Sequence, residues 1–132
     1  MKCLTVRQPW AWAIITGLKP IENRTWPTSH RGPLAIHAGR SRDEFQAGDD
    51  FAVMMPGLPT VDELAYGAII GTVEVVDCVP YETVKDRPFA EPLGWCWVLE
   101  NPRPVEPIPM AGRLGLFEIE LSTVLIDGNL VA

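Results

Sequence analysis

The chain of 132 residues has the length of one domain, and it can bury a hydrophobic core without disulfides or metals. Its net charge of −6 argues against a general polyanion binder, and no apolar run reaches the roughly 20 residues of a membrane span. The N-terminus, MKCLTVRQPW, lacks the apolar run of a signal peptide. We therefore expect residues 1–132 to form a single cytoplasmic domain with no membrane contact.

The first third of the chain predicts a strand, a helix and a second strand. The β-branched run at 3–6 is typical of a strand. Pro9 and Gly17 predict the limits of a helix of about two turns, because proline suits a first helical turn and glycine the residue after the last. The alternation of residues 21–26 indicates an extended strand.

The rest of the chain predicts strands joined by loops. Alternating or β-branched runs predict further strands at 33–38, 66–79, 94–101 and 114–121. Ser41 and Glu44 have the spacing of a capping box and predict a helix over 42–55, and a similar pattern predicts a helical turn at 60–64. The proline-rich segment 102–113 is expected to be an extended connection, and 122–132 a tail or an edge strand.

These elements predict the fold class. There are five or six strands and two or three short helices, and no strand–helix unit repeats, which excludes a doubly wound parallel sheet. Gly67 and Gly71 within a long strand favour the bends that a closed or curled sheet requires. We predict a mainly β (α+β) protein, a small antiparallel or mixed β-barrel flanked by short helices.

The charge is distributed unevenly along the chain. Residues 1–42 carry seven lysines and arginines against one glutamate, whereas residues 43–132 carry four against sixteen acids. A basic segment can attract an anionic ligand to an acidic protein if its cations gather on one face. The sequence alone does not decide whether they do.

The stretch GLKPIENRTW, residues 17–26, is the main candidate for a site. Strand alternation places Glu22, Arg24 and Trp26 on one side, and a small bulge near the following proline would bring Lys19 into phase with them. One interpretation is a surface ion-pair cluster with little effect on stability. The other is a pocket in which Lys19 and Arg24 hold a phosphate or a carbonyl while Glu22 orients them or accepts a proton.

Aromatic and polar residues near this stretch extend the candidate site. Trp10 and Trp26 either pack in the core or stack against an unpaired base, and the Gln8 amide can read a base edge. His37 is either a buried histidine or a residue that faces the barrel mouth, and Arg40 belongs to the same basic segment. The three cysteines are far apart and predict buried free thiols, so we expect no metal site and no cofactor.

The motif G-x-K-x-x-E-x-R, carried by Gly17, Lys19, Glu22 and Arg24, resembles that of the activating-signal-cointegrator homology (ASCH) domain of the PUA-like superfamily. Matching flanks extend the resemblance over nearly the whole chain. It implies a PUA-like β-barrel with a cleft lined by these four residues. It also implies that RNA or a nucleotide is the ligand.

The resemblance leaves two other classes of function open, that of an enzyme and that of a protein-interaction module. Some relatives are ribonucleases, and others are amidohydrolases that act on N4-acetylcytidine. Lys19 and Glu22 would be the catalytic residues of an enzyme. In the amidohydrolases a threonine nucleophile stands at the position of Glu22, which argues against amide hydrolysis by the same mechanism here. A protein-interaction module is the further alternative.

Overall fold

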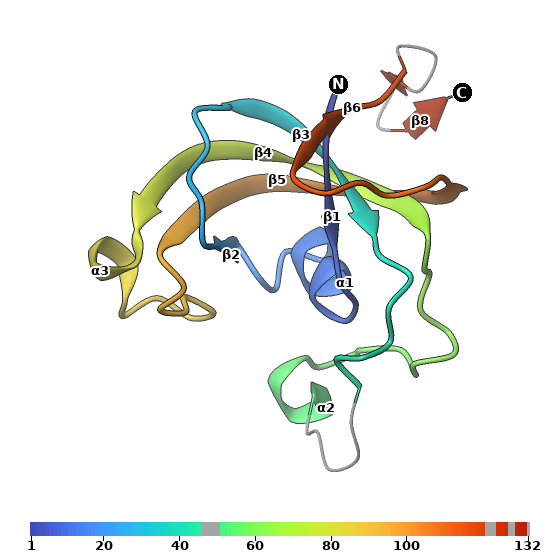
Figure 1. Ribbon diagram of the computed structural model, residues 1–132. Coiled ribbons are helices and arrows are strands. Elements are labelled where there is room, and N and C mark those ends of the chain that lie inside the picture. Colours follow the sequence, from blue (N-terminus) through green and yellow to red (C-terminus); the bar gives the residue numbers. More distant parts are fainter. Residues whose placement is uncertain (46–50, 121–123, 127–128, 132) are drawn as a thin grey trace.

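The computed structural model describes residues 1–45, 51–120, 124–126 and 129–131 (Figure 1). In chain order the helices and strands are β1 (Lys2–Val6), α1 (Trp10–Ile15), β2 (Ile21–Arg24), β3 (Gly32–Ala38), α2 (Phe51–Met54), β4 (Ala68–Pro80), α3 (Tyr81–Val84), β5 (Trp95–Pro109), β6 (Leu116–Glu118), β7 (Val124–Ile126) and β8 (Asn129–Val131). Six of the strands form one sheet in the order β2-β5-β4-β3-β1-β6. Strands β1 and β3 run parallel, and the other neighbours in this sheet are antiparallel.

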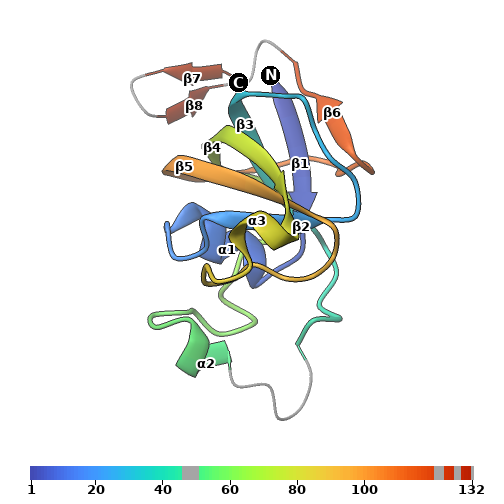
Figure 2. The ribbon, with the colours of Figure 1, turned by 90° about the vertical axis from the view of Figure 1, so that its left-hand side faces the viewer.

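The long strands β4 and β5 curl the sheet into a half-barrel. Figure 1 shows both strands arching over α1, and Figure 2 shows the strong twist between them and β1. The β4–β5 register shifts at three places, between Ile69 and Gly71, between Thr72 and Glu74, and between Val75 and Asp77. Such irregularities increase local twist and bend a strand. The predicted fold class, mainly β with a curled, barrel-like sheet and short helices, is confirmed.

Helix α1 fills the concave side of this half-barrel. Its apolar residues pack against alternate residues of β1, β3, β4 and β5, and this main cluster comprises Leu4, Val6, Ala11, Ile14, Ile15, Leu34, Ile36, Ala38, Ile70, Val73, Val75, Trp97 and Leu99. A second, smaller cluster lies on the other face of β1 and β3 and contains Cys3, Ala35, Ile69, Phe117 and Ile119. Both faces of the central strands are therefore buried, as their continuous apolar sequence predicts.

Gly71 allows β4, β5 and α1 to approach one another closely. A Cβ atom at this position would lie 2.5 Å from the Arg103 carbonyl oxygen and 2.7 Å from Ile15 Cδ1. No side-chain rotation relieves a clash with a backbone oxygen, so any larger residue must separate the two strands. Gly71, which was predicted to bend β4, thus also sets how closely β4 packs against β5 and α1.

The proline-rich segment was predicted to be a connection, and this prediction is wrong. Strand β5 continues through it to Pro109, with Pro104 opposite Gly71 and Pro109 opposite Ala68. Proline is tolerated in a strand whose N–H side lies at a sheet edge. Strand β2 pairs only with residues 95–98 of β5, so among the described residues the remainder of β5 has no hydrogen-bonded strand on its outer side.

The predicted positions and ends of the helices also differ from the structure. Of the helix expected over 42–55, the described residues show a turn at 42–45 and the short helix α2 at Phe51–Met54, and 46–50 lie outside the described residues. The helix α3 was not predicted. The helical turn at 60–64 is a set of hydrogen-bonded turns, in which the Thr60 N–H donates to Glu63 Oε1 and lowers the pKa of that carboxyl group.

The C-terminal segment differs from the expected edge strand. Strands β7 and β8 pair with each other in a separate two-stranded sheet, and they do not extend the main one. The other predicted strands are confirmed with shifted ends. No helix within the described residues is long and apolar enough to cross a membrane.

The close approach at Gly71 leads to a stability prediction. We expect Gly71→Ala to lower the free energy of unfolding by about 1–3 kcal/mol, since the added methyl group overpacks the β4–β5 contact. Gly39→Ala is the matched control, because the nearest atom to its Cβ would be Thr5 Cγ2 at an ordinary 3.4 Å. Urea unfolding measures both variants. Equal stability of the two would show that β4 and β5 can separate without cost.

Candidate functional site

A cleft of about 640 Å³ opens beside β2. It is bounded by the end of β1, the start of α1, the strand β2, the loop before β5 and the loop before β6. Its lining residues are Thr5, Val6, Arg7, Trp10, Lys19, Glu22, Asn23, Arg24, Thr25, Trp26, Glu44, Glu91, Leu93, Arg113, Leu114 and Gly115. Its volume lies within the range of small-molecule sites in proteins, roughly 300–1,000 Å³.

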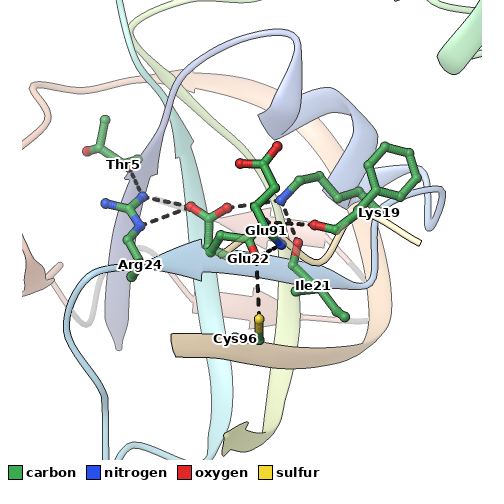
Figure 3. A network of polar contacts seen from close by, with 9 residues as sticks. Thr5, Lys19, Ile21, Glu22, Arg24, Glu91 and Cys96 are labelled. Atoms are coloured by element: carbon green, nitrogen blue, oxygen red, sulfur yellow. Dashed lines mark hydrogen bonds and ion pairs between the residues drawn. The ribbon is translucent and has the colours of Figure 1, made fainter. Parts of the chain in front are cut away.

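Three charged side chains form a buried network at the base of the cleft. The Lys19 amine lies 3.1 Å from Glu22 Oε1, and Arg24 donates from Nε and Nη2 to Glu22 Oε2 at 3.0 and 2.8 Å (Figure 3). Glu22 and Arg24 share one side of β2, because they are two positions apart in a strand. Glu22 is therefore held between two cations.

Lys19 reaches this network from the connection between α1 and β2. Its backbone N–H donates to the Ala13 carbonyl at the end of α1, and its amine also donates to the Ile21 carbonyl. The β2–β5 register contains no shift between Ile21 and Arg24, and Pro20, near which a bulge was expected, lies before β2. Helix capping and strand pairing together place the lysine, with only 6% of its side chain exposed.

Arg24 links the network to β1 and faces the cleft. Its Nη2 group also donates to the Thr5 carbonyl at 2.8 Å, and 23% of its side chain is exposed. Among the described residues, its Nη1 group has no hydrogen-bond partner. With two cations and one anion, the network carries a net charge of +1, so it can accept an additional negative charge from a ligand.

Aromatic side chains form the walls on either side of the network. Trp26 packs edge-to-face on the buried Trp97, with ring centroids 4.9 Å apart. Trp10 makes a similar contact with Phe51, at 5.4 Å. Both Trp10 and Trp26 are half-buried, so each ring is fixed on one side and accessible on the other.

Not all cations of the basic segment face the cleft. Arg7 lines it but pairs with Glu44 at 3.2 Å. Arg113, which lies outside the basic segment, also lines the cleft. Elsewhere, Lys2 pairs with Glu118, Arg31 with Asp77 and Arg42 with Asp62. The positive charge at the cleft is thus a local feature of a few residues and not a continuous basic face.

Four predicted site residues lie away from the cleft lining: Gln8, Gly17, His37 and Arg40. Gln8 is buried, and its amide is engaged on both sides by the Ala65 carbonyl and the Trp12 N–H, each at 2.9 Å. His37 is buried beneath the loop before β6, with Nε2 2.6 Å from the Met110 carbonyl. Arg40 is exposed and lies against Gly67.

Gly17 has a role in the backbone. Its φ of +85° lies in the left-handed region that favours glycine, and it ends α1 as predicted. It also lines a smaller cavity of about 230 Å³ on another side of Lys19.

Asn23 is the residue of this region that the sequence reasoning missed. Its side chain alternates with those of Glu22 and Arg24 along β2, and it lines the same cleft. It donates from Nδ2 to the Phe89 carbonyl at 2.8 Å, and its Oδ1 accepts from the Glu91 N–H at 2.9 Å. The Cys96 thiol lies 3.4 Å from the same oxygen. No signal in one sequence reveals such a contact, because the partners are more than 60 positions away.

The cysteines provide no competing chemistry among the described residues. All three are free thiols, and burial raises the pKa of Cys3 to about 12 and raises that of Cys96. Within the described part of the chain, no group of three or more metal-ligating side chains is present.

Comparison with known proteins places the chain in a family. The sequence matches the ASCH domain over residues 4–109. The chain belongs to the ASCH domain family. This family is PUA-like and often linked to RNA. That residues 1–132 form one such domain remains a prediction.

Individual relatives support the assignment. Human activating signal cointegrator 1 is 31% identical over 90 residues, which are 64% of this chain and 16% of the human protein. The mouse protein is 30% identical over the same shares. This chain therefore spans only a small part of the length of these relatives. A crystal structure of ASCH from Zymomonas mobilis shares the fold, with a TM-score of 0.60 over 91% of this chain and 87% of that one at 15% identity.

The buried network leads to a stability prediction. Glu22→Gln leaves Lys19 and Arg24 without their shared anion, so we expect it to lower the free energy of unfolding by about 3 kcal/mol or more. Lys19→Met should be milder, since the Glu22–Arg24 pair remains.

Glu118→Gln is the control for this experiment. Glu118 is 62% exposed and binds Lys2 and the N-terminal amine at the surface, so we expect the urea midpoint to change little. If the Glu22 and Glu118 variants unfold at the same urea concentration, the network does not depend on the central carboxylate.

Proposed function

We propose that this ASCH domain binds single-stranded RNA, or a nucleotide from it, in the cleft beside β2. The observation that carries the proposal is the Arg24 guanidinium, which is fixed by Glu22 and by the Thr5 carbonyl and lines the cleft together with Trp10 and Trp26. Among the described residues, its Nη1 group has no hydrogen-bond partner. Immobilised guanidinium groups bind phosphate oxygens strongly, because their orientation entropy is already lost.

Each part of the cleft has a role in this proposal. Arg24 and Arg113 bind phosphate groups, and Lys19 adds positive charge from beneath them. Trp10 and Trp26 stack on unpaired bases, which aromatic side chains do with little dependence on sequence. Single-stranded RNA presents both phosphates and unstacked bases, so it matches the two kinds of group.

The geometry of Glu22 favours binding over catalysis. Both of its oxygens already accept hydrogen bonds from cations, so a proton from water or from a ribose hydroxyl would have to compete with these contacts. Lys19 likewise donates to Glu22 and to the Ile21 carbonyl. Incubation of the protein with RNA and with N4-acetylcytidine, followed by product analysis, tests the enzyme alternative separately from binding.

The proposal predicts salt-dependent binding of a short, mixed-sequence RNA, measured by fluorescence anisotropy. We expect Arg24→Ala and Lys19→Ala each to weaken binding, by about tenfold for Arg24, the equivalent of about 1.4 kcal/mol. Arg113→Ala should reduce the slope of log affinity against log salt by about 0.7 for each phosphate group that the variant no longer binds. Circular dichroism checks that each variant is folded.

Arg31→Ala is the matched control, since Arg31 belongs to the basic segment but pairs with Asp77 outside the cleft. It should bind like the unmodified protein. Equal affinity of the Lys19, Arg24 and Arg31 variants would rule out this cleft. No binding at low salt would favour the protein-interaction alternative, and RNA fragments or deacylated cytidine would favour the enzyme.

A further inference from the structure

Glu91 is the cleft carboxylate whose charge the rest of the site does not balance. Glu22 is held by two cations and Glu44 pairs with Arg7. Among the described residues, the exposed Glu91 carboxylate has no hydrogen-bond or ion-pair partner, although it lines the same cleft. Figure 3 draws it on the same side of β2 as the head groups of Lys19 and Glu22.

An unpaired carboxylate is unfavourable in a cleft for a polyanion. It repels phosphate groups, so it lowers affinity unless the ligand offers hydrogen-bond donors at that point. An ionised carboxylate accepts hydrogen bonds and donates none. It therefore selects among ligands by the position of their N–H and O–H groups.

The backbone at Glu91 is held in place by Asn23. The Asn23 amide binds the Phe89 carbonyl at 2.8 Å and the Glu91 N–H at 2.9 Å, and thus clamps the loop on both sides of residue 90. Phe89 has a φ of +68°, which is unfavourable for a residue with a side chain and which these bonds help to maintain. The loop is consequently ordered at the point where it presents the carboxylate.

The base edges of RNA differ in how well they match a carboxylate. Guanine carries two adjacent donors, N1–H and the N2 amino group, which can face both carboxylate oxygens at once. Cytosine and adenine offer one amino group beside a ring acceptor, and uracil offers one N–H between two carbonyls. A bidentate pair with a charged partner is stronger than a single hydrogen bond.

We propose that Glu91 is a specificity-determining residue that selects guanine in the cleft, with Asn23 as its positioning residue. Glu91 accepts from N1–H and from the N2 amino group of the base. Cationic groups of the cleft bind the flanking phosphate. This inference rests on the proposed binding of RNA, and it adds a preference for one base.

The experiment uses the full chain and short uridine oligomers in which one central base is varied. We expect guanine to bind at least tenfold more tightly than uracil, adenine or cytosine. Inosine lacks only the N2 amino group and should fall between guanine and the other bases. GMP alone tests whether the base and one phosphate are sufficient for recognition.

Variants separate the two residues from the rest of the cleft. Glu91→Gln should abolish the preference for guanine and tighten binding to the uridine oligomer, since a charge that repels phosphate groups is removed. Asn23→Ala should reduce the same preference, because Glu91 loses its clamp. Glu106→Gln, which lies on β5 outside the cleft, should retain the preference.

The outcomes distinguish this inference from the proposed function. If every oligomer binds equally, or if Glu91→Gln keeps the guanine preference, the inference is wrong while RNA binding stands. If no oligomer binds at low salt, the proposed function fails first. Inosine binding as tightly as guanine would overturn the bidentate contact.

Discussion

The cleft depends on one carboxylate, that of Glu22, held between Lys19 and Arg24. Glu22 and Lys19 are almost completely buried, and a buried charge is tolerated only when it is paired and hydrogen-bonded. The network ties the Lys19 side chain to the start of β2 through the Ile21 carbonyl, and it ties β2 to β1 through the Thr5 carbonyl. A short edge strand of four residues would otherwise have little to hold it in register.

The half-barrel gives this network its surroundings. The register shifts of β4 and β5 bend the sheet over α1, and Trp97 on β5 lies opposite Glu22 in the pairing with β2. Trp97 in turn supports Trp26 at the cleft wall. Trp97 therefore belongs both to the apolar core and to the support of the cleft, because the wall residue Trp26 packs against it. This arrangement explains how an acidic protein can present a local cationic cleft.

Local patterns in the sequence predicted the parts of the site that lie close together in the chain. Alternation placed Glu22 and Arg24 on one side of a strand, and the charge pattern indicated their pairing with Lys19. The same reasoning could not place Gln8, whose partners Ala65 and Trp12 bury its amide. It also missed the Asn23 clamp, because only the folded sheet brings Phe89 and Glu91 next to β2.

The wrong predictions about the fold have physical causes of the same kind. Proline disfavours a central strand, so the second half of β5 resembled a connection until its position at the sheet edge was known. The capping signal at Ser41 is real, since its hydroxyl accepts from the Asp43 N–H, but it stabilises a turn there and not a long helix.

The central claim is that Arg24, Trp10 and Trp26 together form the RNA contact. Titration of isotope-labelled protein with a short single-stranded RNA, followed by NMR, tests it most directly. The account predicts that the Arg24 Nε–H signal and the indole N–H signals of both tryptophans shift together and saturate at one RNA concentration. Shifts confined to residues around Arg31 and Asp77, with these three signals unchanged, would contradict it.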